Sequence, residues 1–111
     1  LLVTGFPYNR NEIMPELLAR FERFLRSCHD VRRLGSAALD LCWVAAGRLD
    51  GYWEQNLNPW DVAAGTLILT EAGGKVTDFN GKKWPKMQDF GRQILASNGK
   101  IHAEMKNILA A

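Results

Sequence analysis

The sequence predicts an α/β fold, a layered sheet of about five strands with helices on both faces. Three observations support this prediction. Short apolar segments alternate along the chain with longer segments whose apolar residues recur every three or four positions. Glycine and asparagine-glycine pairs separate the two kinds of segment. Two of the helical segments are apolar on nearly every side, as is typical of helices inside a layered fold. We expect a single α/β domain over residues 1–111.

The first elements follow from apolar runs and helix signals. Residues 1–4 are predicted to form a buried strand. Asn11 is expected to cap a helix that runs to about Ser27, with Pro15 in its first turn. Residues 30–34 form a short candidate strand. The chain thus opens with a strand, a helix and a second strand.

A second helix is predicted over residues 37–46, with Ser36 as its N-cap. Its residues are apolar on nearly every side, so we expect it to be buried. It contains one acid, Asp40, which we expect to be held by the helix N-terminus or by Arg32 or Arg33 rather than to be catalytic.

The remaining elements continue the alternation. They are a strand over 49–54, a helix over 59–72, a strand over 75–79, a polar loop over 82–89, a strand over 93–97 and a closing helix with Ile101, Met105, Ile108 and Leu109 on one stripe.

The helix over 59–72 carries an acid in its first turn. Asn58 is a good N-cap, Pro59 falls at the first helical position, and Gly73 supplies a left-handed C-terminal cap. Asp61 stands three residues after the cap, as in a capping box. The body of the helix, 62–72, is predicted to be largely buried. Asp61 has two interpretations: it caps the helix, or it is a ligand of Mg²⁺, which prefers oxygen ligands. The two roles can coexist, because a carboxylate has two oxygens.

Composition narrows the classes of partner. The net charge of +2 gives no basis for a nucleic-acid or anionic-membrane partner, and no apolar run approaches the ~20 residues of a membrane span. Cys28 and Cys42 form no metal-binding motif, so we expect free thiols in a reducing, cytoplasmic compartment. His29 and His102 are isolated and expected to be surface residues. No strand is followed by a Gly-x-Gly-x-x-Gly motif, which argues against a dinucleotide-binding module.

Several motifs in combination resemble one known family. The stretches are Arg32-Arg33-Leu34-Gly35-Ser36-Ala37-Ala38, Gly51-Tyr52-Trp53-Glu54, Pro59-Trp60-Asp61-Val62-Ala63-Ala64-Gly65 and Glu71-Ala72-Gly73-Gly74. Together they resemble the C-terminal half of inositol monophosphatases, over essentially the whole chain. The resemblance implies a Mg²⁺-dependent phosphomonoesterase that hydrolyses inositol monophosphate or a related polyol or sugar phosphate, in which metal-activated water attacks phosphorus in line.

The resemblance also implies roles for individual residues. Asp61 matches a catalytic metal-binding aspartate, Glu54 an acid that binds sugar hydroxyls, Gly35, Ser36 and Ala37 a substrate-contacting loop at a helix start, and Arg32 a basic residue near the substrate. Each residue also has a purely structural interpretation. Gly35 could serve only a tight turn and Ser36 only a cap; Glu54 could be a solvated strand-end residue, and Arg32 could only pair with Asp40.

One departure from the family pattern is large. The acidic Asp-Pro-Ile/Leu-Asp-Gly run, the upstream metal-binding glutamate and the water-activating threonine are all absent from this sequence. One carboxylate cannot organise several Mg²⁺ ions. We therefore expect this chain alone to have negligible activity and weak Mg²⁺ affinity. Because it opens with a strand-like run and no Met, we expect it to be the C-terminal part of a longer protein.

The expected partners are a small-molecule phosphate ester and a second copy of the protein, in a homodimer that includes the rest of the chain. Two alternatives stay open. One is a non-catalytic interaction or dimerisation module. The other is a related phosphatase that acts on fructose bisphosphate, histidinol phosphate or adenosine bisphosphate.

Overall fold

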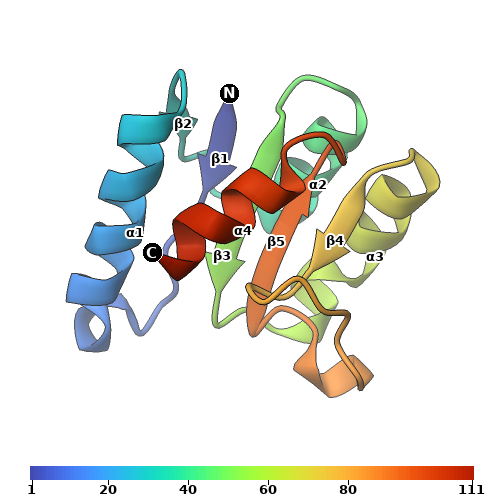
Figure 1. Cartoon of the computed structure of the whole chain (residues 1–111). Coiled ribbons are helices and arrows are strands. Elements are labelled where there is room, and N and C mark those ends of the chain that lie inside the picture. Colours follow the sequence, from blue (N-terminus) through green and yellow to red (C-terminus); the bar gives the residue numbers. More distant parts are fainter.

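Five strands form one mixed sheet in the order β2-β1-β3-β5-β4 in the computed structural model, which describes residues 1–111 (Figure 1). The strands are β1 (Leu2–Thr4), β2 (Val31–Arg32), β3 (Gly51–Gln55), β4 (Lys75–Thr77) and β5 (Gln93–Ser97). β1 runs parallel to both β2 and β3, whereas β5 is antiparallel to β3 and β4. In the register of the central strands, Tyr52 lies opposite Val3 on one side and Ala96 on the other.

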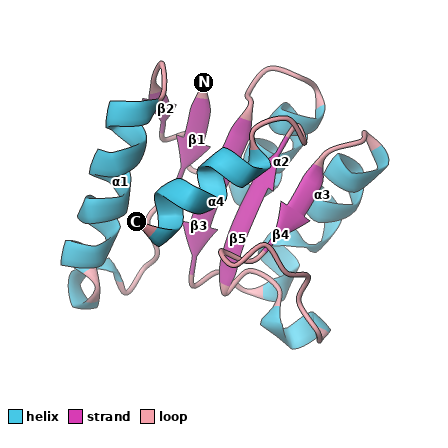
Figure 2. Cartoon of the chain, viewed as in Figure 1, coloured by secondary structure: helices cyan, strands magenta, loops and turns pink.

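Helices cover both faces of this sheet, as the sequence predicted (Figures 1 and 2). The α-helices are α1 (Met14–Ser27), α2 (Ala37–Ala45), α3 (Pro59–Glu71) and α4 (His102–Ala110), and two short 3₁₀ turns are η1 (Arg10–Glu12) and η2 (Met87–Asp89). α1 and α4 pack on one face, and α2 and α3 on the other. None of these helices has the length and apolar character needed to cross a membrane.

Alternate side chains of β3 enter two separate cores, because successive residues of a strand point to opposite faces. Tyr52 packs with Leu41, Val62 and Leu69 beneath α2 and α3. Trp53 points to the other face and stacks on Phe24 of α1 with ring centroids 3.9 Å apart. The strand is buried along its whole length, which is what a central strand covered on both sides requires.

The predicted caps of α2 and α3 are confirmed. Ser36 Oγ accepts a hydrogen bond from Leu39 N at 3.3 Å. The backbone N–H of Asn58 donates to Asp61 Oδ2 at 2.9 Å, so Asp61 does cap α3. Gly73 has a φ of +90° just beyond the last turn, the left-handed conformation that glycine adopts without a steric penalty.

The start of the first helix was predicted wrongly. Asn11 lies inside the 3₁₀ turn η1, and α1 begins at Met14 with Pro15 in its first turn. Proline fits only the first turn of a helix, because it has no N–H to donate and its ring clashes with the preceding turn. Pro15 therefore sets the boundary later than the capping residue suggested.

The prediction that α2 and α3 are buried on most sides is also wrong. Leu39 of α2 is 55% exposed and Leu67 of α3 is 62% exposed, and Trp43 and Ile68 are exposed as well. Each helix contacts the sheet and its neighbouring helix, while its outer side has no covering layer. We call these four side chains the outer α2–α3 face. Where the two helices meet, a Cβ on Gly65 would lie 2.7 Å from Leu41 Cβ, so the close approach of the helices depends on glycine.

His102 was expected on the surface and is buried instead. Its Nδ1 lies 2.8 Å from Ser97 Oγ and its Nε2 lies 2.8 Å from Thr77 Oγ1. These contacts tie the start of α4 to β5 and β4, and burial lowers the pKa of His102 to about 4. His29 is exposed, as expected, and Cys28 and Cys42 are free thiols, as expected.

Candidate active site

A cavity of about 430 Å³ opens where the parallel strands β1 and β3 end and the helices α2 and α3 begin. Its wall is made of the segment after β1, the last residues of β3 and the loop after it, and the first turns of both helices. The carboxyl ends of parallel strands and the N-termini of helices are a common location for ligands in α/β folds, since both leave unpaired backbone groups and side chains that converge on one edge.

Five of the six predicted site residues line this cavity. They are Gly35, Ser36 and Ala37 from the start of α2, Glu54 from β3 and Asp61 from the first turn of α3. Segments far apart in the sequence thus converge on one cavity. The wall also includes side chains that sequence reasoning did not select, namely Tyr8, Arg10, Arg33, Asp40, Asn56 and Trp60.

The sixth residue, Arg32, lies elsewhere. Its guanidinium forms an ion pair with Asp30, so the interpretation that it pairs with Asp40 is wrong. The neighbouring Arg33 lines the cavity instead. Successive side chains of an extended segment point to opposite sides, so one of the two arginines faces the cavity and the other does not.

Glu54 is held in the floor of the cavity and is only 8% exposed, so the interpretation as a solvated strand-end residue is wrong. The hydroxyl of Tyr52 donates a hydrogen bond to Glu54 Oε1 at 2.6 Å. Burial raises the pKa of Glu54, while the Tyr52 hydrogen bond and the charge of Arg33 act in the opposite direction. The carboxyl group lies against Gly5, since a Cβ at that glycine would be 2.3 Å from Oε1.

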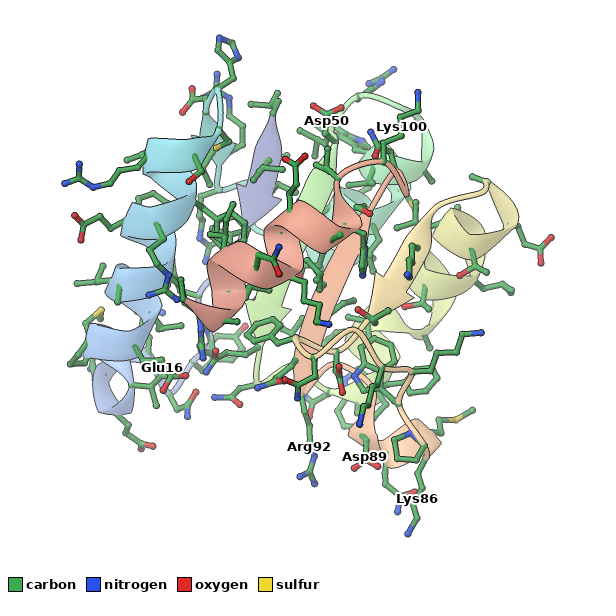
Figure 3. All side chains as sticks on the ribbon, in the orientation of Figure 1. Glu16, Asp50, Lys86, Asp89, Arg92 and Lys100 are labelled. Carbon is green, nitrogen blue, oxygen red and sulfur yellow. The ribbon has the colours of Figure 1, made fainter.

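The end of β3 is fixed from its other side. Gln55 follows Glu54 and donates from Nε2 to Glu16 Oε1 of α1 at 3.1 Å, and Arg20 donates to the same oxygen at 2.7 Å. Glu16 is labelled in Figure 3, where it lies at the lower end of α1. These bonds restrain the end of β3 next to Glu54.

Asp40 is the acid that sequence reasoning set aside. It lies in the cavity wall but is only 1% exposed, and its Oδ1 has no hydrogen-bond partner. Neither the helix N-terminus nor an arginine pairs with it, so that expectation is wrong. Burial, and then the charge of Glu54, raises the pKa of Asp40 to about 7, while Arg33 opposes the shift. An acid inside a helix that is otherwise apolar was the sequence signal for it.

The start of α2 presents backbone donors to the cavity. Gly35 has a φ of +90°, which brings the chain into the helix through a left-handed residue. The Ser36 side chain caps the N–H of Leu39, so Ser36 has the structural role that was predicted for it. Ala37 follows as the first helical residue and lines the cavity. The first N–H groups of a helix have no partner within it.

Asp61 lies at the mouth of the cavity and is half-buried. Its Oδ2 is engaged in the α3 cap, which leaves Oδ1 for a further partner. No group of three or more His, Cys, Asp or Glu side chains converges to hold a metal ion. The residues present therefore do not form a complete Mg²⁺ site, and Asp61 could supply at most one part of it.

Comparison with known proteins gives consistent results. A sequence model described as the inositol monophosphatase family matches residues 1–111. A protein of Synechocystis sp. named inositol-1-monophosphatase is 50% identical over the whole chain and 38% of its own length. The Nus factor SuhB of Pasteurella multocida is 56% identical over 73% of the chain and 30% of its own length.

The fold has equally clear relatives. A solved structure of an inositol monophosphatase from Anabaena (Nostoc) sp. superposes with a TM-score of 0.90 at 48% identity, covering 98% of this chain and 42% of the other. The matches therefore cover between 30% and 42% of the length of these relatives.

Proposed function

Because this chain belongs to the inositol monophosphatase family, we propose that the complete protein carrying it is a phosphomonoesterase. We further propose that the enzyme depends on Mg²⁺ and hydrolyses inositol monophosphate or a related polyol or sugar phosphate. In this proposal residues 1–111 are the C-terminal, substrate-recognising part of a cytoplasmic enzyme. The similarity to a relative named inositol-1-monophosphatase supports the choice of substrate.

One observation carries the proposal: a single cavity brings together Glu54, the start of α2 and Asp61. Glu54 offers a buried carboxyl that accepts a hydrogen bond from a substrate hydroxyl. The backbone N–H groups at the start of α2 donate to substrate oxygens, where the helix dipole favours negative charge. Arg33 adds a positive charge to the same wall, which favours an anionic substrate.

Magnesium would polarise the phosphate and lower the pKa of a bound water. Within this chain only Asp61 matches a ligand position, and no complete set of ligands is formed. We propose that Asp61 contributes one ligand to a site whose other ligands lie outside residues 1–111. The steps that these residues perform are substrate binding, orientation of its hydroxyl groups and compensation of its negative charge.

The test is Mg²⁺-dependent phosphate release from inositol 1-phosphate by the complete protein and by residues 1–111 alone. We expect turnover only by the complete protein. Asp61→Asn should abolish it, and Glu54→Gln should raise KM. Glu104→Gln is a matched control, because Glu104 is exposed on α4, away from the cavity. If residues 1–111 alone released phosphate and Asp61→Asn abolished this release, the proposal that the other Mg²⁺ ligands lie outside residues 1–111 would be contradicted.

A panel of substrates tests the specificity. Trp60 precedes Asp61, and Glu54 precedes it by seven positions, a spacing that favours the inositol group of the family. We expect kcat/KM for inositol 1-phosphate to exceed the values for fructose bisphosphate, histidinol phosphate and adenosine bisphosphate. A higher value for one of these three would reassign the substrate within the same reaction class.

A second candidate function is a non-catalytic interaction or dimerisation module. The outer α2–α3 face favours it, because Leu39, Trp43, Leu67 and Ile68 are large exposed apolar side chains on adjacent helices. Residues 1–111 alone should then associate in a concentration-dependent way, and Leu67→Glu should reduce the association. A concentration-independent monomer in sedimentation would argue against this function.

A further inference from the structure

Three acids line the cavity, and their partners differ. Glu54 receives the Tyr52 hydroxyl, and Asp61 receives the N–H of Asn58. Asp40 is the most deeply buried of the three, and its Oδ1 has no partner. An ionised carboxylate that is buried and lacks a hydrogen-bond donor is more costly than a neutral carboxylic acid in the same place. Its surroundings therefore favour a proton on Asp40.

The charges around Asp40 point the same way. Asp40 faces Glu54 and the buried Tyr52 of β3 and Arg33 of the loop before α2, while the charge of Asp61 of α3 acts on Tyr52 and Glu54. Glu54 has a hydrogen-bond donor and Asp40 has none. Where two acids compete for one negative charge, the acid with a donor retains it. Arg33 favours ionisation of both carboxyls, so it does not change which of the two loses its proton more readily.

We propose that Asp40 is a positioning residue that holds a buried proton, so that of these two neighbouring acids Glu54 alone carries a negative charge. Glu54 then presents a carboxylate to a substrate hydroxyl, while a neutral Asp40 adds no repulsion of an anionic substrate. When Asp40 loses its proton to the solvent as the pH rises through the range around its raised pKa of about 7, a further negative charge enters the wall. This inference rests on the proposed function, because it assumes that Glu54 binds a hydroxyl of a polyol phosphate.

The kinetic test uses the complete protein that carries residues 1–111. KM and kcat for inositol 1-phosphate are measured from about pH 6 to about pH 9 for the wild type, Asp40→Asn, Glu54→Gln and the Glu104→Gln control. We expect the ratio of wild-type to Asp40→Asn KM to rise about 3- to 10-fold across this range as Asp40 ionises. The ratio for kcat should change much less. A KM ratio that is constant with pH would overturn the inference.

An infrared measurement in Mg²⁺-free buffer gives a readout that does not need activity. The wild type at about pH 6 should show the carbonyl band of a buried protonated carboxyl. The band should be absent from Asp40→Asn and present in Glu54→Gln. If Asp40→Asn does not fold, a band that is present in the wild type and retained in Glu54→Gln still assigns the proton to Asp40. A wild type without this band, or a band that persists in Asp40→Asn, contradicts a proton on Asp40.

The two proposals fail in different ways. A Glu54→Gln protein with unchanged KM would refute hydroxyl recognition by Glu54, and with it the proposed function of this site. A raised KM in Glu54→Gln together with a missing Asp40 band would refute only the role of Asp40.

Discussion

Gly5 and Glu54 occupy adjoining space at the floor of the cavity: a Cβ on Gly5 would lie 2.3 Å from Oε1 and 2.9 Å from Oε2 of Glu54. The glycine follows β1, and the glutamate lies on the neighbouring parallel strand β3. The absence of a side chain just after one strand therefore provides the space for a buried carboxyl on the next. Tyr52 fixes that carboxyl from its own strand.

Gly5→Ala should displace the Glu54 carboxyl. The added methyl group has no room, and overpacking of this kind costs about 1–3 kcal/mol. We expect a lower free energy of unfolding and a higher KM for the polyol phosphate, with kcat less affected. Urea denaturation and steady-state kinetics measure the two effects. Glu54→Asp in the same protein shortens the acid and should restore part of the stability; an unchanged KM in Gly5→Ala would show that the carboxyl position is not important.

Tyr52→Phe should leave Glu54 Oε1 without its donor. Loss of one partner of a buried hydrogen bond costs about 1–3 kcal/mol, and we expect this loss in the free energy of unfolding. The bond lowers the pKa of Glu54, so its removal should raise that pKa. The rise in KM that accompanies protonation of Glu54 on acidification should then begin at a higher pH. Tyr8→Phe removes an exposed hydroxyl and should leave the stability unchanged. If Tyr52→Phe left the pH dependence of KM unchanged, the role of Tyr52 would be contradicted.

Gly65→Ala should weaken the contact between α2 and α3. Alanine favours a helix over glycine by up to ~1 kcal/mol, but its Cβ would lie 2.7 Å from Leu41 Cβ and from Leu41 Cδ1. We expect the clash to dominate, with a net loss of about 1–2 kcal/mol in thermal or urea unfolding. In combination with Leu41→Ala the added loss should be smaller, because the contact with Cδ1 is gone and only the contact with Cβ remains. A stabilised Gly65→Ala protein would show that the helices separate at little cost.

His102 should make the protein less stable in mild acid. Its pKa is lowered from 6.5 to about 4 in the folded state, so between these values the unfolded chain binds a proton that the folded chain does not. Its contribution is complete above pH 6.5 and declines as the pH falls toward 4, by about 2 kcal/mol at pH 5. The stability advantage of the wild type over His102→Gln, measured by urea unfolding, should therefore shrink with acidification.

The matched control for His102 is His29→Gln, because His29 is exposed. Its stability should follow that of the wild type at every pH. If the difference between wild type and His102→Gln stayed constant with pH, burial would not be keeping the histidine neutral.

Local sequence determined the features that depend on near neighbours. The capping of α3 by Asp61, the left-handed Gly73 and the Ser36 cap are set within about four residues, where helix-end chemistry acts. The alternation of apolar segments predicted a sheet with helices on both faces, because burial on both sides of a central strand leaves a recognisable pattern. The motif combination around Glu54 and Asp61 indicated the family, which the comparisons confirm.

Only the tertiary structure decided which side of each element is covered. Apolar content alone could not show that Leu39 and Leu67 face outward, that Arg33 rather than Arg32 lines the cavity, or that His102 is buried. The unpaired state of Asp40 likewise depends on β3, which follows it in sequence but lies beside it in space. Burial and charge are set by contacts between distant segments, and a pattern read along one segment contains no information about them.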